Sequence, residues 1–172
     1  AESINVDYIL GGPAGATKDA ALAKANSILN IVNSRKDCIA FFSPMRSDVI
    51  GQTNSDTITN KILTYFQSIG STSYAVLDSG YKYIYDKYSD VYRYIPCNGD
   101  VAGLCLQTGI NQDPWFSPAG FSRGVLRNAI KLAYSPNKDQ RDKLYSERIN
   151  PIVTFPGQGV ILFGDKTALG YQ

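Results

Sequence analysis

Few residues in this sequence carry the side chains that enzymes most often use for proton transfer, nucleophilic attack or metal binding. Histidine is absent from all 172 positions, which excludes Ser-His-Asp and Cys-His catalysis. The three cysteines, Cys38, Cys97 and Cys105, do not form CxxC pairs, so a zinc site would need carboxylates to complete its ligand set. We therefore predict buried, reduced thiols, no catalytic residue, no metal and no cofactor.

One glycine-rich turn, Gly11–Thr17, has the composition of an anion-binding loop. It follows an apolar stretch and precedes a helical pattern at 18–33 that Thr17 would cap, and a helix N-terminus offers free N–H groups. The turn contains neither GxxxxGK[ST] nor GxGxxG, and Pro13 removes one donor. Residues 164–167 (Gly-Asp-Lys-Thr) likewise lack the first glycine of a phosphate loop. Glycines that simply turn the chain are favoured, and a small α/β anion- or nucleotide-binding domain stays as the alternative.

The elements around this turn alternate between strand and helix. Apolar runs typical of buried strands lie at 4–10, 37–43 and 74–78, and amphipathic helical spacing covers 18–33 and 56–69. Regular alternation is typical of right-handed crossovers and a parallel sheet between helical layers. We predict one α/β domain over residues 1–172, with a mixed, largely parallel sheet flanked by helices.

Tyrosine alternates with other residues in two runs separated by a polar turn at 86–90. This alternation predicts an antiparallel β-hairpin with an aromatic face, added at one side of the parallel sheet. Tyrosine suits such a half-buried face, because its ring packs while its hydroxyl reaches water or a partner. The tyrosines in the two runs are Tyr81, Tyr83, Tyr85, Tyr92 and Tyr94.

The segment 113–124 holds Trp115 and Phe116 between Pro114 and Pro118. Each proline restricts the residue before it to extended conformations, so no helix runs through the segment. We predict an aromatic plug pinned onto the domain, and expect Trp115→Ala to cost about 3–5 kcal/mol, as for buried aromatics.

The second half of the chain has weaker patterns. We predict a helix that either Asn98 or Asp100 caps and that ends at Gly109, and a strand within 125–134 centred on Ile130 and Leu132. A charged helix is expected at 139–149, stopped by Pro151, and a final core strand at 160–163.

The composition excludes further classes of function. The formal net charge is only +2 and no basic block stands out, so nucleic-acid binding by phosphate neutralisation is poorly supported. No apolar run approaches the roughly 20 residues of a membrane span. The first residue is not Met, so we expect a processed chain or a piece of a longer one.

Several blocks of residues, in order from Asp37 to Ala168, resemble the tail sheath proteins of contractile-tailed bacteriophages. The Trp…Ser-Pro-Ala-Gly…Arg-Gly block and the Gly-Asp-Lys-Thr ending are specific together, whereas either alone is weak. The blocks are Asp37-Cys38 with Ser43-Pro44-x-Arg46, Gly80-Tyr81-Lys82-Tyr83-x-Tyr85-Asp86-Lys87-Tyr88, Asp100-Val101-Ala102-Gly103-Leu104-Cys105, Trp115-x-Ser117-Pro118-Ala119-Gly120-Phe121-x-Arg123-Gly124, Gln140-Arg141-Asp142-x-Leu144-Tyr145, Ile149-Asn150-Pro151 and Phe163-Gly164-Asp165-Lys166-Thr167-Ala168.

The resemblance implies a structural, non-enzymatic subunit that polymerises around a tail tube and contracts to drive it through the host envelope for genome delivery. Implied partners are other sheath copies, the tube protein, and baseplate and tail terminator proteins, in a virion tail assembled in the host cytoplasm. Family members are much longer, so we expect a fragment that holds the conserved core, lacks most terminal arms and is monomeric alone. A sheath from a phage-derived injection particle is a further alternative.

Within this interpretation we assign ten residues to holding the module rigid, and we consider four arginines as possible intersubunit contacts. Exposed arginine–carboxylate pairs are usually worth little, so a solvated surface is about as good an interpretation of Arg46 and Arg123. For the charged helix that carries Arg141 and Arg148, a plain solvent face is favoured over a contact with a neighbour. The ten residues are Tyr81, Tyr83, Tyr85, Trp115, Pro118, Gly120, Arg123, Gly124, Gly164 and Asp165; the arginines are Arg46, Arg123, Arg141 and Arg148.

Overall fold

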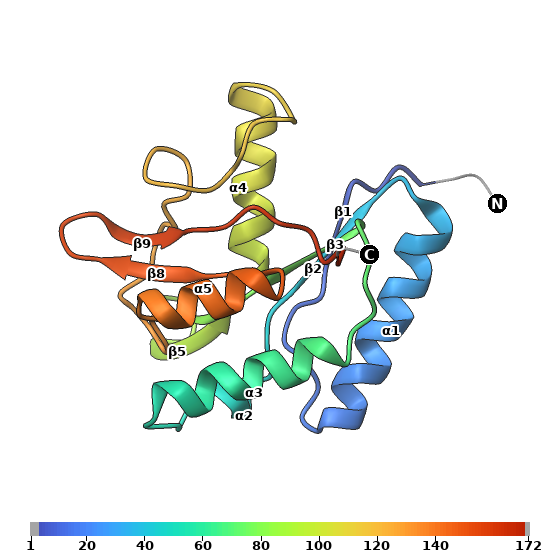
Figure 1. Cartoon of the computed structure of the whole chain (residues 1–172). Coiled ribbons are helices and arrows are strands. Elements are labelled where there is room, and N and C mark those ends of the chain that lie inside the picture. The colour runs from blue at the N-terminus through green and yellow to red at the C-terminus, as the bar shows by residue number, and fades with distance from the viewer. Residues whose placement is uncertain (1–3, 171–172) are drawn as a thin grey trace.

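A four-stranded parallel sheet is the centre of the computed structural model, which describes residues 4–170 (Figure 1). Its neighbouring strands are all parallel, so every connection crosses over through other elements. The expected α/β class is confirmed. The strands, in spatial order, are β1 (Tyr8–Leu10), β2 (Ile39–Phe42), β3 (Ala75–Asp78) and β7 (Ile149–Asn150).

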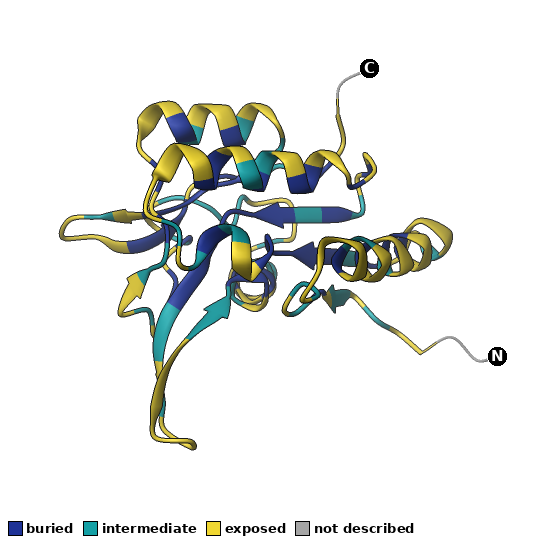
Figure 2. Cartoon of the chain, turned by 90° about the horizontal axis from the view of Figure 1, so that it is seen from below, coloured by how far each residue is buried: buried dark blue, intermediate teal, exposed yellow. Residues whose placement is uncertain are grey.

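Helices cover both faces of this sheet, as Figure 2 shows. Ala40 and Phe42 of β2 belong to a core shared with α1 (Lys18–Arg35), α3 (Ser55–Gln67) and α5 (Lys138–Ser146). Phe41 points to the opposite face, into a second core with α4 (Asn98–Asn111). Successive strand residues face opposite sides, so the continuous apolar run at 37–43 reflects a strand buried on both faces, as predicted.

Side-chain caps fix where three helices begin. Thr17 accepts a hydrogen bond from the Ala20 N–H, as predicted for the start of α1, and Asn54 caps α3 through the N–H groups of Asp56 and Thr57. Asn137 and Gln140 form a capping box at the start of α5. The Gln140 side-chain amide also donates to Ser55 Oγ at 2.9 Å and to Asp56 Oδ1 at 2.8 Å, which joins the first turns of α3 and α5.

The tyrosine hairpin forms as predicted, from β4 (Tyr81–Asp86) and β5 (Val91–Pro96). It does not extend the parallel sheet. Its strands form a separate antiparallel sheet with β6 (Lys131–Leu132), in the order β5-β4-β6. The central sheet among the described residues is therefore purely parallel, and the antiparallel strands project from it (Figure 2).

Three expectations for the second half needed correction. The α4 helix runs through Gly109 to Asn111, because a helix interior tolerates an isolated glycine at modest cost. The α5 helix ends at Ser146, before Arg148 takes a positive φ of 66°, and Ile149 belongs to β7. The strand expected within 125–134 is reduced to β6 and one bridge between Val125 and Ile161.

The last part of the chain forms a two-stranded antiparallel sheet of β8 (Ile152–Phe155) and β9 (Gly159–Leu162). The final strand was predicted, whereas β7 and β8 were missed. A short helix, α2 (Arg46–Val49), was also missed and follows β2 directly. None of the helices within residues 4–170 combines the length and the apolar character needed to cross a membrane.

Candidate functional site

The glycine turn lies where β1 leads into α1, and one N–H and two carbonyls of the turn have hydrogen-bond partners within the protein. Gly11 N–H donates to Phe41 O at 2.8 Å, and a Cβ at Gly11 would lie 2.8 Å from that oxygen. Asn98 Nδ2 donates to Gly12 O and Lys24 Nζ donates to Pro13 O, both at 2.8 Å. The glycines thus allow close approach of backbone to backbone. The anion-binding alternative is not favoured, because Lys24, the cation beside Gly12, donates to a backbone carbonyl.

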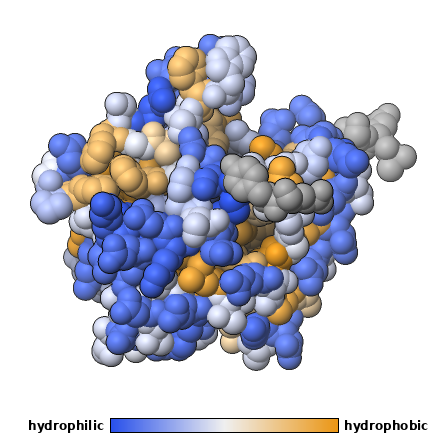
Figure 3. Space-filling model, in the orientation of Figure 1, coloured by the Kyte–Doolittle hydropathy of each residue, from blue (hydrophilic) through white to orange (hydrophobic). Residues whose placement is uncertain are grey.

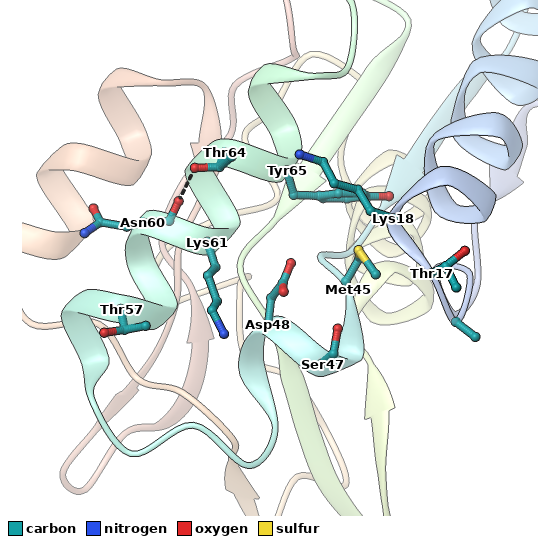
Figure 4. A pocket seen from close by; sticks show the side chains of 11 residues that line it. Thr17, Lys18, Met45, Ser47, Asp48, Thr57, Asn60, Lys61, Thr64 and Tyr65 are labelled. Carbon is teal, nitrogen blue, oxygen red and sulfur yellow. Dashed lines mark hydrogen bonds between the residues drawn. The ribbon is translucent and has the colours of Figure 1, made fainter.

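Beside this turn, a groove of about 560 Å³ opens between α1, α2 and α3 (Figure 4). We call it the α1–α3 groove. Figure 4 shows Lys18 reaching across from α1, with Asp48 of α2 and Lys61 of α3 on the far side. Burial raises the pKa of Asp48, and the nearby Lys61 and Lys18 oppose that rise. Its lining residues are Ala16, Thr17, Lys18, Met45, Ser47, Asp48, Thr57, Asn60, Lys61, Thr64 and Tyr65.

A buried polar junction lies at the carboxyl end of β3. Asp78 is 1% exposed; its carboxylate accepts hydrogen bonds from the Ser43 hydroxyl at 2.7 Å and the Gly80 N–H at 2.9 Å. Ser43 Oγ in turn accepts from the Asn98 N–H at 3.0 Å. Burial raises the pKa of Asp78 to about 7, against the two hydrogen bonds, which lower it. The junction joins β2, β3, β4 and the start of α4.

The tyrosine hairpin divides into a buried base and an exposed tip. Tyr81 is 1% exposed and donates its hydroxyl hydrogen to Pro44 O at 2.9 Å. Tyr83 pairs across the strands with Tyr94, and Tyr85 with Tyr92; their ring centroids are 4.7 Å and 5.0 Å apart. Tyr85 is 42% exposed near the tip. The predicted aromatic face exists, but only its base is anchored in the core.

The predicted Trp115 plug is wrong, because Trp115 is 78% exposed. The loop is held by other groups: Gly120 N–H donates to Leu162 O at 2.9 Å, and Arg123 Nε donates to Ser117 O at 2.7 Å. Pro118 is half-buried beside these contacts. A Cβ at Gly124 would lie 2.6 Å from Leu162 O, so this glycine allows the loop to approach β9. Backbone contacts and the Arg123 side chain, rather than the indole, hold the segment in place.

The Gly164-Asp165 segment also has internal contacts. A Cβ at Gly164 would lie 2.9 Å from Asn150 Oδ1, and that oxygen accepts the Lys166 N–H at 2.8 Å. Asp165 accepts a hydrogen bond from the Tyr145 hydroxyl at 3.3 Å. These contacts hold the chain after β9 against β7 and α5.

Three of the four arginines hold neighbouring backbone. Arg46 Nη1 donates to Tyr94 O at 3.0 Å, and Arg148 Nε donates to Leu169 O. Arg123 holds its own loop, as described above. Arg141 differs, because its guanidinium lies over the rings of Phe155 and Phe163, 5.4 Å and 5.5 Å from their centroids.

Phe121 completes an aromatic patch with these two rings, at centroid distances of 5.1 Å from Phe155 and 5.8 Å from Phe163. Phe121 is 51% exposed and Phe163 40% exposed. Figure 3 shows apolar surface over the β8–β9 hairpin, where this aromatic patch lies. Aromatic and arginine side chains together are typical of protein–protein contacts.

No group of three or more potential metal ligands occurs within residues 4–170, and Cys38, Cys97 and Cys105 are free thiols there. Sequence reasoning missed Asp78, Asp48 and Lys61. Asp78 ends a buried strand, and a carboxylate in that position is a usable signal. The groove residues gave no signal, because only the packing of three helices brings them together.

The sequence matches the family model described as the phage tail sheath protein central domain over residues 4–168. The tail sheath protein of Enterobacteria phage T4 is 38% identical over 177 residues, covering 97% of this chain and 27% of that protein. The tail sheath protein of Vibrio phage KVP40 is also 38% identical, with the same coverage. That of Salmonella phage ViI is 34% identical, covering 86% of this chain and 23% of that protein.

Solved structures show the same fold in contractile assemblies. A contracted sheath complex of the PVC extracellular contractile injection system superposes with a TM-score of 0.72 at 15% identity, covering 99% of this chain and 42% of that one. The contracted helical sheath of the anti-feeding prophage gives 0.68 at 14% identity, covering 97% and 40%. The chain spans about a quarter of the length of the curated relatives it matches. It belongs to the phage tail sheath protein family, as its central domain.

Proposed function

We propose that this chain is the core module of a contractile phage tail sheath subunit. The observation that carries the proposal is the 38% identity to the T4 tail sheath protein along 97% of the chain. Copies would polymerise around the tail tube in the host cytoplasm and contract in the virion, driving the tube through the host envelope for genome delivery. Heterologous contacts, in which one face of a subunit binds a different face of the next, generate open helical assemblies.

The module itself would act as a rigid body during contraction, without catalysis. Two hydrophobic cores enclose the parallel sheet, and close-packed interiors move as solid units while their interfaces exchange contacts. If contraction releases about 1–3 kcal/mol of free energy per subunit, the size of an ordinary coupling free energy, the total adds up over many copies. No nucleotide hydrolysis is then required.

The partners that we propose are further sheath copies, the tube protein, and baseplate and tail terminator proteins. An anti-feeding prophage baseplate structure shares this fold, with a TM-score of 0.64 at 15% identity. The phage relatives are 34–38% identical to this chain, against 14–15% for the injection-system structures. This difference favours a phage tail over a phage-derived injection particle.

Of the four arginines, we propose Arg141 as the best intersubunit contact, since it forms part of the aromatic patch. Arg46, Arg123 and Arg148 each hold backbone within the chain. Arg141→Glu in the longer subunit should weaken polymerisation. Lys138→Glu makes a matched charge reversal in the same helix, outside the aromatic patch, and should leave polymerisation unchanged.

Negative-stain electron microscopy of the longer subunit tests the main proposal. We expect hollow striated cylinders. A subunit that never polymerises, alone or with a tail tube, would refute it. We also propose that residues 1–172 alone are monomeric, which sedimentation can check. Micromolar nucleotide binding in calorimetry, lost on Gly12→Val, would support the anion-binding alternative instead.

A further inference from the structure

We propose that the α1–α3 groove binds an extended acidic segment of a polypeptide partner. The groove is formed by side chains of α1, α2 and α3 around a floor of Met45 and Tyr65, both buried (Figure 4). Neither the family match nor the structural likeness assigns it a ligand. The inference rests on four polar side chains that make no side-chain hydrogen bond or ion pair with any other residue in 4–170.

Lys18 and Lys61 carry the first two unused groups. Within residues 4–170, neither ammonium group makes a hydrogen bond or an ion pair. Other lysines of this chain are used: Lys24 Nζ holds Pro13 O at 2.8 Å, and Lys82 Nζ pairs with Asp100 Oδ1 at 2.7 Å. Two lysines that line one hollow against the single carboxylate of Asp48 therefore provide a local excess of positive charge.

Tyr65 and Asp48 carry the other two groups. Tyr65 is 3% exposed, and its hydroxyl has no hydrogen-bond partner among the described residues. No buried side-chain oxygen in that part of the chain lacks a partner, so this hydroxyl faces the open groove. The Asp48 carboxylate also accepts no hydrogen bond there, although burial raises its pKa. An unpaired hydroxyl on a buried ring is costly unless a ligand or water completes it.

An acidic peptide satisfies all four groups together. Its side-chain carboxylates would accept hydrogen bonds from the two lysines, and a backbone carbonyl would accept one from the Tyr65 hydroxyl. A backbone N–H would donate to Asp48. Inorganic phosphate offers acceptors for the lysines, but it lacks the neutral backbone N–H that a peptide brings to Asp48, and the Asp48 carboxylate repels it. The single carboxylate among the cations thus selects a peptide over a simple anion.

The α1–α3 groove is also continuous with a second hollow, so that an extended polypeptide could lie along both. A second hollow of about 520 Å³ shares Ala16 and Ser47 with the groove and continues toward Tyr94 and Pro96 of β5. Arg46 lines this continuation and uses one guanidinium nitrogen for Tyr94 O, leaving further N–H donors. With Lys18, Lys61 and Arg46 against Asp48, the path carries a net positive charge that complements an acidic segment.

Fluorescence anisotropy with a labelled octaglutamate peptide tests this binding on the 172-residue chain. We expect saturable binding that weakens as salt is added, because the lysine contacts are exposed to screening. Lys18→Gln with Lys61→Gln should lower the affinity at least tenfold. Tyr65→Phe, which removes only the hydroxyl, should lower it about 3- to 10-fold, the range of one ordinary hydrogen bond.

The control variant is Lys87→Gln with Lys138→Gln, which removes the same charge from exposed positions outside the groove and should bind like the wild type. Octaglutamine should not bind, and inorganic phosphate at equal concentration should not displace the peptide. Equal loss in the control variant, binding of octaglutamine, or displacement by phosphate would overturn the proposal. If the lysine variant fails to fold, Tyr65→Phe decides alone: unchanged affinity overturns the proposal.

In the sheath, a neighbouring subunit would supply the acidic segment, and only this part of the inference rests on the proposed function. The binding assay uses single chains and needs no polymer. A groove that fails to bind leaves the sheath proposal intact. A longer subunit that never polymerises leaves the groove result intact.

Discussion

Replacing Asp78 by asparagine should change how the stability of this domain depends on pH. The Asp78 carboxyl is buried, and its pKa is raised to about 7 in the folded chain, from the ordinary value of 3.8. Between these two pH values the folded state holds a proton that the unfolded state has released. Unfolding therefore becomes easier as pH rises through this window.

The magnitude follows from the two pKa values. A rise from 3.8 to about 7 corresponds to a loss of about 4 kcal/mol in the free energy of unfolding between pH 4 and pH 8. Well below pH 3.8 the carboxyl is neutral in both states, and this pH-dependent loss of stability vanishes. The amide that replaces it in Asp78→Asn would be neutral throughout and would keep an oxygen to accept the Gly80 N–H. The stability of the variant relative to wild type should therefore rise by about 4 kcal/mol across the window.

Urea denaturation followed by far-ultraviolet circular dichroism, at steps from pH 4 to pH 8, measures this difference. Circular dichroism is preferred because Trp115, the one tryptophan, is 78% exposed before unfolding and its emission would change little. Asp142→Asn removes one exposed carboxylate from α5 and should give a curve parallel to wild type. Parallel curves for Asp78→Asn and wild type would refute the reasoning that burial controls this carboxyl.

Three further substitutions test the contacts at the hairpin and the Trp115 loop. Tyr81→Phe should cost about 1 kcal/mol because it leaves the buried Pro44 carbonyl without its donor, and Tyr85→Phe, at the exposed tip, should cost less; equal effects in urea denaturation would contradict the division of the hairpin. Trp115→Ala should change the free energy of unfolding by no more than about 0.5 kcal/mol, because the indole is exposed. A loss of about 3 kcal/mol, the cost of truncating a buried aromatic, would show that Trp115 is buried after all. Gly124→Ala should cost about 1–3 kcal/mol because the new methyl would meet Leu162 O, while Gly103→Ala, with open space around it, should be neutral or stabilising in thermal melts.

The first half of the chain could be predicted because its signals are local. Thr17 caps a helix whose apolar positions repeat at helical spacing, and the tyrosine runs alternate at strand spacing. These patterns extend over only a few residues, so the helix and the hairpin can be predicted from the sequence alone. The separation of the hairpin from the parallel sheet depends on distant pairing with β6, which no local pattern records.

The second half was harder because its short strands depend on tertiary pairing. β7 has two residues and exists through its register with Leu77 and Asp78 of β3. Trp115 was misplaced because large aromatic residues are usually buried, whereas backbone contacts of Gly120 and the guanidinium of Arg123 hold its loop. The α1–α3 groove is likewise a product of packing, since Lys18, Asp48 and Lys61 lie far apart in the sequence.

The side chain of Gln140 connects the N-terminal turns of two helices, α3 and α5, through hydrogen bonds. It closes the capping box of α5 and reaches Ser55 and Asp56 in the first turn of α3. Fraying at one helix start therefore releases the other. The first turns of α3 and α5, joined by bonds that span 84 and 85 positions, would loosen as a single unit of local opening.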